Sequence, residues 1–480
     1  MAAGVAAAFA NQEVALAHLP SVVLELGETF TAAGKELALV GGPVRDAFLG
    51  VRPHDFDLTT NATPAQTEEI LGQAGWKTWG LGREFGTIAG RRAGVTVEIT
   101  TYRTEEYEVG SRKPAVQFGD NIEGDLTRRD FTVNAMALRL PDLTLVDPLG
   151  GLADLLAGVL RTPVTAEQSF DDDPLRIMRA ARFAAQLGFD VSEDVLVAMS
   201  RMRDRLKIVS AERIREELVR LIVGQYARRG VELLVYAEVA DIVLPELSAL
   251  QATKDEHGRH KDVYEHTLTV LDQAIALETD AEGDVPGPDF VLRFAALMHD
   301  IGKPATRRFE ANGTVSFHHH EIVGAKMTRK RMVALRFDKD TTRKVTKLVE
   351  LHLRFHGYGE QKWTDSAVRR YVADAGDMLT RLHRLTRADC TTRNRKKSAR
   401  LSHAYDDLER RIAELAKQEE LDAIRPDLDG GEIMEILGLR PGPEVGRAYK
   451  FLLALRMEEG PLGKEEAKSR LLAWHQENKS

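Results

Sequence analysis

The N-terminal fold is decided by the stretch LALVGGPVRDAFLG (37–50), which HDFDLTT (54–60) follows almost at once. An apolar run that predicts a strand ends at a double glycine, and Asp55 and Asp57 come soon afterwards. Glycine lets the backbone approach a phosphate closely, and N–H groups at a helix start can bind it. Residues i and i+2 of a strand lie on one face, so the two carboxylates should converge on a hard cation such as Mg²⁺. The stretch predicts a phosphate-binding turn beside a metal site.

A third carboxylate is Glu98, in the alternating run GVTVEITTYR (94–103), which predicts another strand. A neighbouring strand could present Glu98 to the two aspartates. Three carboxylates can hold two metal ions, which stabilise the attacking and leaving oxygens of an in-line displacement at phosphorus. A D-x-D pair and a glycine turn each occur by chance, but their order and spacing together favour catalysis.

Arginines and a carboxylate follow in DLTRRDFTVNAMAL (125–138), which brings Arg128, Arg129, Asp130 and Asn134 together. Guanidinium groups beside a metal-bound triphosphate neutralise it through bidentate hydrogen bonds. An ordinary surface RRD sequence is the alternative for this stretch taken by itself.

The run DDDPLRIMRAARFAAQLGF (171–189) places Asp173 and Arg176 on one face of a predicted helix, with Arg179 and Arg182 close by. Cytosine and adenine each present an amino donor, which a carboxylate can accept, beside a ring nitrogen, to which a guanidinium can donate. Guanine and uracil carry a carbonyl in place of the amino group and would leave buried polar groups unpaired. The pair predicts selection of C and A; a surface ion pair at i, i+3 spacing is the alternative.

The composition predicts a globular protein of several folding units: the chain has 480 residues, 43% hydrophobic and 29% charged. Residues 31–150 alternate short apolar runs with turn residues, which indicates mixed α/β structure, and helical periodicity begins at about residue 152. The single cysteine, Cys390, allows neither an internal disulfide nor a thiolate-rich zinc site. No uninterrupted apolar run is long enough to span a membrane. We therefore expect a cytoplasmic protein without a membrane partner.

Positive charge is segregated, although the net charge is −8. Three runs, 201–230, 326–347 and 393–400, are rich in arginine and lysine. A solvated helix face explains any one of these runs. Three of them in one acidic chain favour a polyanionic partner.

Most of the 14 histidines lie between residues 256 and 400. Imidazole and carboxylate ligands without thiolate suit Mn, Fe, Ni or Mg more than structural zinc. The adjacent His-Asp pair in LMHDIGKP (297–304), with further histidines on either side, resembles the HD-superfamily metal phosphohydrolases. The resemblance implies a divalent metal held by His266, His299, Asp300, His320, His352 and Asp389, with His318, His319 and His356 competing for ligand roles.

The chain resembles bacterial class II tRNA nucleotidyltransferases, the CCA-adding enzymes, in the ordered motifs LVGGPVRDAFLG, HDFDLTT, VEITTYR, DLTRRDFTVNAMA, DPLGG, DDDPLRIMRAARFAAQLGF and SAERIREEL (210–218). The resemblance extends from about residue 30 to the end of the chain. It implies an α/β head like that of polymerase β, with five strands, followed by all-α neck, body, HD and tail regions. It also implies addition of C, C and A to the tRNA 3′ end from CTP and ATP, without a nucleic-acid template.

The resemblance implies a division of the chain into an N-terminal helical segment (1–30), a nucleotidyltransferase head (31–155), a helical neck and body that reads the base and binds RNA (156–250), an HD domain (251–400) and a helical tail (401–480). Its basic helices would hold the tRNA acceptor arm by phosphates and shape. Some bacterial CCA-adding enzymes carry such an HD unit with phosphatase or 2′,3′-cyclic phosphodiesterase activity, so a second, hydrolytic activity is implied here.

Residue roles follow from the matching motifs. Asp55 and Asp57 are implied as Mg²⁺ ligands and Glu98 as the acidic residue near the 3′-hydroxyl. The family's base-reading motif usually begins Glu-Asp, whereas this chain has Asp172 before Asp173. Glu212 and Arg213 match a neck motif that supports the nucleotide pocket. The implied nucleotide-binding residues are Gly41, Gly42, Arg45, Asp46, Arg128, Asp130, Asn134, Asp173, Arg176, Arg179 and Arg182.

Three alternatives remain open from the sequence. A poly(A) polymerase shares the head, but the acidic chain and GLGREFGTIAG (80–90) fit a tRNA enzyme better. An enzyme that adds only CC or only A is the second. The segment between Glu98 and Asp125 keeps the flexible loop needed for the switch to A, which favours full CCA addition. An HD regulator with an inactive head is the third, and the intact carboxylates argue against it.

Overall fold

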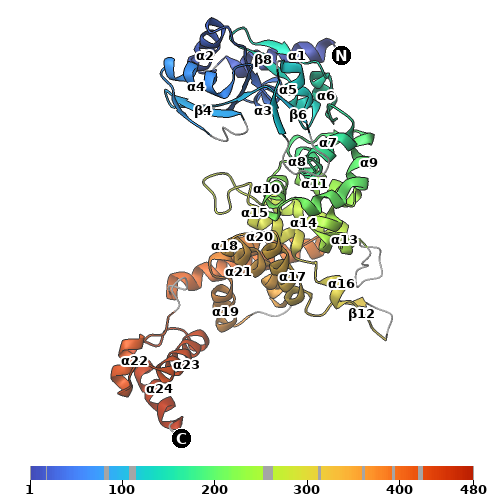
Figure 1. The fold of residues 1–480 in the computed structure, drawn as a ribbon. Coiled ribbons are helices and arrows are strands. Elements are labelled where there is room, and N and C mark those ends of the chain that lie inside the picture. Colours follow the sequence, from blue (N-terminus) through green and yellow to red (C-terminus); the bar gives the residue numbers. More distant parts are fainter. Residues whose placement is uncertain are drawn as a thin grey trace. The chain divides into compact units, whose positions relative to one another are not determined.

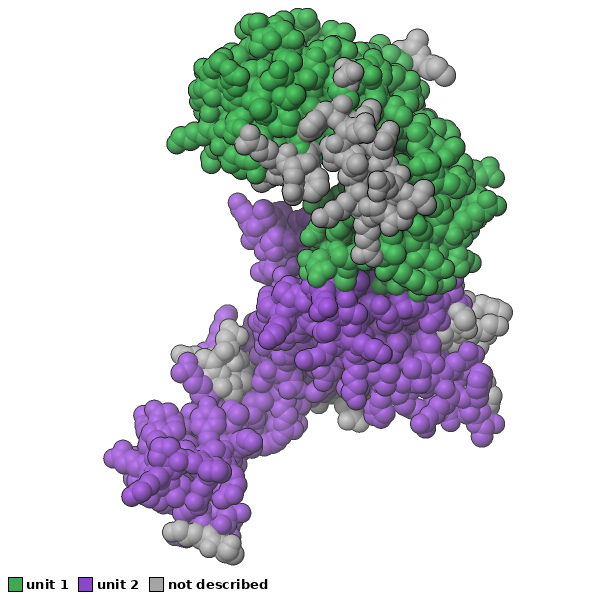
Figure 2. All heavy atoms as spheres, in the orientation of Figure 1, with its two compact units in different colours: residues 1–243 green, residues 244–480 purple. Residues whose placement is uncertain are grey.

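The computed structural model describes residues 2–17, 19–80, 86–106, 115–119, 121–251, 263–311, 315–358, 363–391, 395–419 and 425–478. The chain forms two compact units, residues 1–243 and residues 244–480 (Figure 2). A mixed sheet organises the first half of unit 1, and helices make up most of the rest of the described chain.

The head of unit 1 is built on a seven-stranded sheet in the order β3-β4-β5-β2-β1-β8-β9. The resemblance implied five strands; the short edge strands β3 and β9 pair antiparallel with β4 and β8 and extend the sheet on either side. The pair β2–β5 is parallel. The strands are β1 (Leu37–Val40), β2 (Phe56–Thr60), β3 (Lys77–Trp79), β4 (Thr87–Arg92), β5 (Val95–Thr101), β8 (Ala137–Arg139) and β9 (Thr144–Val146), and a separate pair is formed by β6 (Arg103–Glu106) and β7 (Ala115–Phe118).

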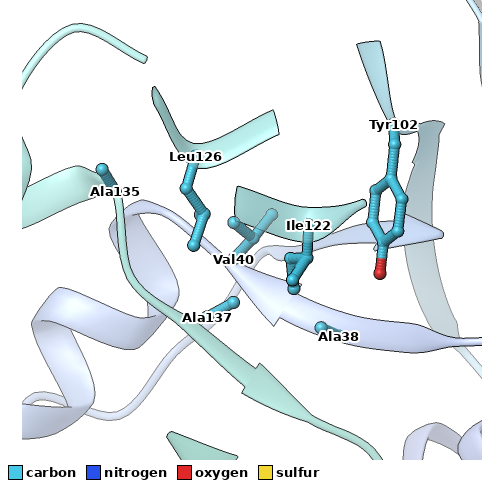
Figure 3. Close-up of a cluster of buried hydrophobic side chains, with 7 residues drawn as sticks. All are labelled: Ala38, Val40, Tyr102, Ile122, Leu126, Ala135 and Ala137. Atoms are coloured by element: carbon cyan, nitrogen blue, oxygen red, sulfur yellow. The ribbon is translucent and has the colours of Figure 1, made fainter. Parts of the chain in front are cut away.

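A buried cluster fixes helix α5 against the sheet (Figure 3). Ile122 and Leu126 point from α5 toward Ala38 and Val40 on β1, and all four are at most 1% exposed. This packing places Asp125, on the same helix, beside the strands that carry the acidic motifs. The head helices are α1 (Ala2–Leu16), α2 (Ser21–Ala32), α3 (Gly42–Phe48), α4 (Pro64–Gln73), α5 (Ile122–Thr127) and α6 (Gly151–Ala157).

The rest of unit 1 is a helical bundle in which α8 packs against α10 and α11 (Figure 1). Ser210 caps α10, because its hydroxyl accepts a hydrogen bond from the Arg213 N–H. Ile214, Leu218 and Leu221 then form one buried face at helical spacing. The elements are β10 (Val159–Leu160), α7 (Ala166–Asp172), α8 (Arg176–Leu187), β11 (Asp190–Val191), α9 (Glu193–Met202), α10 (Ala211–Ile222), α11 (Ala227–Tyr236) and α12 (Ala240–Val243).

In its described residues, unit 2 is helical apart from the small hairpin β12 (Arg308–Phe309) and β13 (Val315–Ser316) and an isolated bridge between Thr279 and Pro286. No helix within the described ranges has the length and apolarity that crossing a bilayer requires. The helices are α13 (Pro245–Leu250), α14 (Val263–Ala276), α15 (Phe290–Met298), α16 (Lys303–Thr306), α17 (His320–Ala334), α18 (Lys339–Leu351), α19 (Asp365–Ala375), α20 (Leu379–Asp389), α21 (Arg395–Glu419), α22 (Gly430–Leu437), α23 (Pro443–Glu459) and α24 (Lys464–Glu477).

Candidate functional site

The three predicted carboxylates of the head lie on adjacent strands. In the parallel β2–β5 pair, Asp57 is the register partner of Glu98. Asp55 lies just before β2, not in it as expected, but the buried Phe56 between the two aspartates keeps both on the open side. Partial desolvation and the nearby Asp55 raise the pKa of Asp57, although Arg129 opposes the shift. Partial desolvation, then Asp57 and Asp55, raise the pKa of Glu98. The three therefore repel one another, and a divalent cation would relieve that repulsion.

The turn between β1 and α3 depends on Gly41, whose φ of 79° and ψ of −133° are open almost only to glycine. A Cβ at this position would lie 3.3 Å from Nη1 of Arg129 and 3.8 Å from the carbonyl oxygen of Asn134. Gly42 begins α3, which carries Arg45 and Asp46. The turn therefore brings bare backbone next to an arginine that also lowers the pKa of Asp57.

A hydrogen-bond chain links α3 to the neck helix α8. Arg45 donates from Nε to Asp46 Oδ1 at 2.8 Å and from Nη1 to Asn134 Oδ1 at 2.7 Å. Asn134 donates to Asp130 Oδ1 at 3.1 Å, and Arg179 donates to Asp130 Oδ2 at 2.8 Å. Burial raises the pKa of Asp130, but Arg179 and Asn134 outweigh it and hold the pKa at about 2. Five of the predicted nucleotide-binding residues thus form one network.

The network continues to Glu217, a buried carboxylate on α10 that the sequence analysis did not identify. Arg182 forms an ion pair with Glu217, with 3.1 Å between Nε and Oε2, and Arg179 Nη1 lies 3.8 Å from Oε1. Burial and the neighbouring Arg179 lower the pKa of Arg182 to about 10. The Phe183 ring lies under the guanidinium groups of Arg45, Arg179 and Arg182, whose carbons are 5.3, 5.4 and 4.2 Å from its centroid. The sequence does contain a signal for Glu217. In the helical run SAERIREEL it lies three residues after Ile214, and this spacing places both residues on the inward face of the helix.

Asp125 is the second site residue that the sequence analysis passed over. It is fully buried and accepts hydrogen bonds from Arg128 at 2.8 Å, Arg129 at 3.1 Å and Thr59 at 3.2 Å. Burial raises the pKa of Asp125, but the two arginines outweigh it and the net shift is downward. Arg128, expected to face a triphosphate, is therefore paired with Asp125 and only its outer part is exposed.

The predicted base-reading pair is not on one helix face. Helix α7 ends at Asp172, and Asp173 is extended because it precedes Pro174, which disfavours helical geometry in the residue before it. Asp173 accepts a hydrogen bond from Arg213 Nη2 at 3.3 Å. Arg176 begins α8 and donates to Ser169 Oγ at 2.9 Å and to the Arg128 carbonyl oxygen at 2.6 Å. The i, i+3 ion pair weighed as the alternative is absent from these described residues.

The six predicted ligands of unit 2 come together in two groups of three. His266, His299 and Asp389 form one group, and Asp300, His320 and His352 the other; within each group the ligand atoms lie within 4.8 Å of one another. No further group of this kind is found in the described ranges, and the head carboxylates are not one of them. The distance is 2.9 Å from His266 Nε2 to Asp389 Oδ1 and 3.2 Å from His320 Nε2 to Asp300 Oδ1.

Three imidazoles of this cluster are oriented by backbone. The Nδ1 atoms of His299, His320 and His352 lie 2.7, 2.9 and 2.6 Å from the carbonyl oxygens of Ala296, Phe317 and Val349, so Nδ1 must carry the proton. Their Nε2 atoms are buried and make no hydrogen bond. Inward Nε2 atoms without a partner are the arrangement that metal ligation requires, so the donor set fits a divalent cation.

The pKa values of two histidines in the cluster are strongly shifted. Burial lowers the pKa of His299, but Asp300 and Asp389 outweigh it and raise the pKa to about 10. Burial, with His299 next, lowers the pKa of His352 to about 3. His318 and His319 are exposed, whereas His320 is buried, and the side chain of His356 lies outside the described ones. Geometry therefore selects His320 from the three consecutive histidines.

Three family models match the chain. The Poly A polymerase head domain matches residues 37–161, the model described as "Probable RNA and SrmB- binding site of polymerase A" matches 188–250, and the HD domain matches 263–394. The Bacillus stearothermophilus CCA-adding enzyme, solved in complex with CTP, has the same fold: the TM-score is 0.68 at 22% identity, over 96% of this chain and 98% of that one.

Curated relatives match nearly the whole chain. The A-adding tRNA nucleotidyltransferase of Deinococcus radiodurans is 34% identical, over 92% of this chain and 96% of the relative. The CC-adding tRNA nucleotidyltransferase of Thermus thermophilus is 32% identical, over 92% and 94%. The CCA-adding enzyme of Streptococcus thermophilus is 32% identical, over 91% and 93%. The motifs, the polymerase-type head with its paired carboxylates and these full-length matches agree: the chain belongs to the tRNA nucleotidyltransferase family, with an HD domain in its second unit.

Proposed function

We propose that this protein adds C, C and A to the tRNA 3′ end from CTP and ATP, without a nucleic-acid template. The observation that carries the proposal is the register pairing of Asp57 with Glu98, with Asp55 adjacent, beside the Gly41 turn. The full-length relatives support transfer to tRNA in preference to poly(A) synthesis.

In this mechanism Asp55 and Asp57 would hold Mg²⁺, which would supply charge neutralisation for the triphosphate and activation of the 3′-hydroxyl. Glu98 faces that hydroxyl from the adjacent strand. The 3′-hydroxyl releases its proton to solvent as its oxygen bonds to the α-phosphorus, the bond from that phosphorus to its bridging oxygen breaks, and pyrophosphate leaves. The Gly41 turn and Arg129 position the phosphates, and the Arg45–Asn134–Asp130–Arg179 chain holds the head against the base-binding neck.

Base selection is assigned to Asp173 and Arg176. Asp173 keeps 31% of its side chain exposed, so its carboxylate is accessible to an amino group. Arg213 orients that carboxylate. On nucleotide binding, Arg176 would exchange its hydrogen bond to Ser169 for one to the ring nitrogen. A wrong base would then leave both groups without partners.

Full CCA addition is the finer part of the proposal, because relatives of all three specificities match at 32–34% identity. The segment that the sequence analysis assigned to the switch from C to A runs through the antiparallel pair β6–β7. Residues 107–114 and 120 of this segment lie outside the described residues. The β6–β7 pair is the feature that supports retention of the switch.

Incorporation assays test the reaction. With Mg²⁺, tRNAs ending before CCA, after C and after CC are each incubated with a single labelled nucleotide: CTP, ATP, GTP or UTP. The expected result is C on the first two, A on the third, and no incorporation of G or U. Long A tails would mark a poly(A) polymerase, C or A alone a partial enzyme, and no incorporation would refute every transferase assignment.

A single substitution tests the assignment of base reading to Asp173 and Arg176. Arg176→Ala should relax discrimination against UTP and GTP, whereas Arg201→Ala, at an exposed arginine on α9, should leave it unchanged. Unchanged discrimination in Arg176→Ala contradicts the assignment.

The HD cluster supports a second activity, hydrolysis of a phosphoester at an RNA 3′ end. Its two groups of three ligands would hold a divalent metal centre of one or two ions, which activates water when bound. With a 2′,3′-cyclic phosphate, the water oxygen bonds to phosphorus, one ring P–O bond breaks and the released ribose oxygen takes up a proton. Such repair would suit a damaged tRNA end. Metal-dependent hydrolysis that persists in the double variant His299→Ala, Asp300→Ala would show that the assignment is wrong.

We place these activities in the cytoplasm, since the single cysteine, Cys390, fits a reducing compartment and tRNA is processed there. The basic runs of the neck and unit 2 are proposed to bind tRNA phosphates, which makes binding weaken steeply with salt.

A further inference from the structure

The hairpin β12–β13 exposes an aromatic ring next to the HD cluster. Phe309 is 74% exposed, twice the 37% of Phe9, the other exposed phenylalanine among the described residues. One face of its ring is covered by Arg307, whose guanidinium carbon lies 4.7 Å from the ring centroid. The preceding strand residue, Arg308, is also exposed. The hairpin therefore presents an aromatic face flanked by positive charge.

The positive charges of Arg307 and Arg308 are not paired with a carboxylate among the described residues. Among the described residues, neither Arg307 nor Arg308 has a carboxylate oxygen within 4.0 Å of its guanidinium nitrogens. The one carboxylate on this hairpin, Glu310, is instead bound by the Ser316 hydroxyl. A pair of arginines without an acidic partner beside an exposed ring is the combination used to bind single-stranded nucleic acid, where bases stack and phosphates meet guanidinium groups.

The hairpin is tied to the metal cluster at both ends. On its N-terminal side, Lys303 bonds the predicted ligand Asp300 at 2.8 Å and lies 5.6 Å from the centroid of the Phe317 ring. On its C-terminal side, Phe317 follows β13 directly and its carbonyl oxygen lies 2.9 Å from Nδ1 of the ligand His320. The two ends are held close because Gly302 has no side chain: a Cβ there would lie 2.1 Å from the His320 carbonyl oxygen.

The reach is short. Phe309 pairs with Val315, which is two residues from Phe317. Strands lie about 4.8 Å apart and a residue spans at most about 3.6 Å, so the Phe309 backbone is within about 12 Å of Phe317. An RNA nucleotide adjacent to the reacting 3′ end can cover this distance between Phe317 and Phe309.

We propose that the hairpin is a docking arm for the single-stranded 3′ end of an RNA, with a base one or two nucleotides upstream of the reacting phosphoester stacked on the free face of Phe309 and its phosphate held by Arg307 and Arg308. The inference rests on the phosphohydrolase activity proposed above, and it assigns substrate selection at that site: RNA ends are preferred to free mononucleotides. A protein partner is disfavoured by the two uncompensated arginines and by the nearby phosphoester site.

The test compares two substrates. A four-nucleotide RNA ending in a 2′,3′-cyclic phosphate reaches the arm, whereas 2′,3′-cyclic AMP does not. In the full-length protein, Phe309→Ala should raise KM for the tetranucleotide about tenfold and leave kcat/KM for cyclic AMP unchanged. Phe309→Trp should restore the tetranucleotide KM. The matched control is Val333→Ala, another exposed apolar residue of unit 2, at 56% exposure, which should change neither. Equal losses on both substrates, or none, overturn the proposal.

A binding measurement separates the arm from the chemistry. A four-nucleotide RNA with 2-aminopurine next to its 3′-hydroxyl end should lose fluorescence on binding the wild-type protein, because the base stacks, and should keep it with Phe309→Ala. If neither substrate is hydrolysed by any variant, the phosphohydrolase proposal fails while this titration still decides the arm. Equal quenching by both proteins refutes the arm, as does a Phe309→Ala change that alters only the sedimentation coefficient, which would mark an interface between copies.

Discussion

At the scale of single residues, the head chemistry rests on carboxylates whose surroundings differ sharply. Asp57 and Glu98 are open to solvent and have raised pKa values, whereas Asp125 and Asp130 are buried and have lowered ones. The open pair is free to hold a cation, and the buried pair holds arginines in place. Carboxylates of the same head thus have different tasks because their burial and partners differ.

Removing the exposed carboxylate of Asp57 tests whether this residue holds a cation. Asp57→Asn should reduce incorporation of CTP and ATP by about a thousandfold, since it removes several kcal/mol of metal-mediated charge stabilisation in the transition state. The melting temperature should stay the same, because the side chain is exposed. Asp142→Asn, an exposed carboxylate between β8 and β9, is the control for a change of charge. Near wild-type incorporation by Asp57→Asn would remove this residue from the metal site.

The buried Asp130 predicts a pH dependence of stability. Its pKa is about 2 in the folded protein against 3.8 for an unperturbed carboxyl, so its contribution is present above about pH 4 and is lost as the pH falls toward 2. The shift corresponds to about 2 kcal/mol. Urea unfolding of Asp130→Asn between pH 4 and pH 2.5 should therefore show a smaller loss of stability than the wild type. An identical slope would mean that Arg179 does not stabilise the charged form.

At the scale of elements, the neck helices α8 and α10 are joined by charge as well as by apolar packing. Glu217 on α10 is 4% exposed and faces both Arg179 and Arg182 on α8. Because α8 also reaches Asp130 in the head, Glu217 supports the arginines that connect the two regions. Neighbouring Glu216 on the same helix is exposed.

These adjacent glutamates form a matched pair for a test. Glu217→Gln leaves two desolvated guanidinium groups without their shared counter-ion and should destabilise unit 1 by about 3 kcal/mol. It should also raise KM for CTP and ATP. Glu216→Gln should change the free energy of unfolding by less than about 0.5 kcal/mol. Equal effects of the two variants in urea unfolding would show that the buried pair contributes nothing specific.

At the scale of the whole molecule, the two proposed chemistries lie in different compact units. The head carboxylates and the neck belong to residues 1–243, and all six HD ligands belong to residues 244–480. Separate compact units and separate proposed metal sites should allow each activity to survive loss of the other.

Adjacent histidines test this separation. His320→Ala removes a buried ligand and should lower the stoichiometry of bound Mn²⁺, the melting temperature of the metal-loaded protein and cyclic-phosphate hydrolysis, while CTP incorporation continues. His319→Ala, at an exposed neighbour, should leave metal content and both activities intact. Conversely, Asp57→Asn should retain hydrolysis. If His320→Ala also stops CTP incorporation, the two units are coupled in function.

The sequence by itself determined the local parts. The glycine turn, the aspartate pair, Glu98 and the RRD and HD motifs are short-range patterns, and strand alternation or helical spacing places their side chains without knowledge of the fold. The class of chemistry could be predicted from them for that reason, and the domain types followed from the resemblance of these motifs to known families.

Only the tertiary structure decided which long-range partners these side chains have. Sequence spacing put Asp173 and Arg176 on one helix, but Pro174 breaks that helix and the two residues bond Arg213 and Ser169 instead. Glu217 pairs with Arg182, which lies 35 residues earlier in the chain. His320 differs from its neighbour His319 as a candidate ligand only because His320 is buried. Burial and charge pairing across distant segments depend on packing, and packing is the property that a pattern along the chain does not contain.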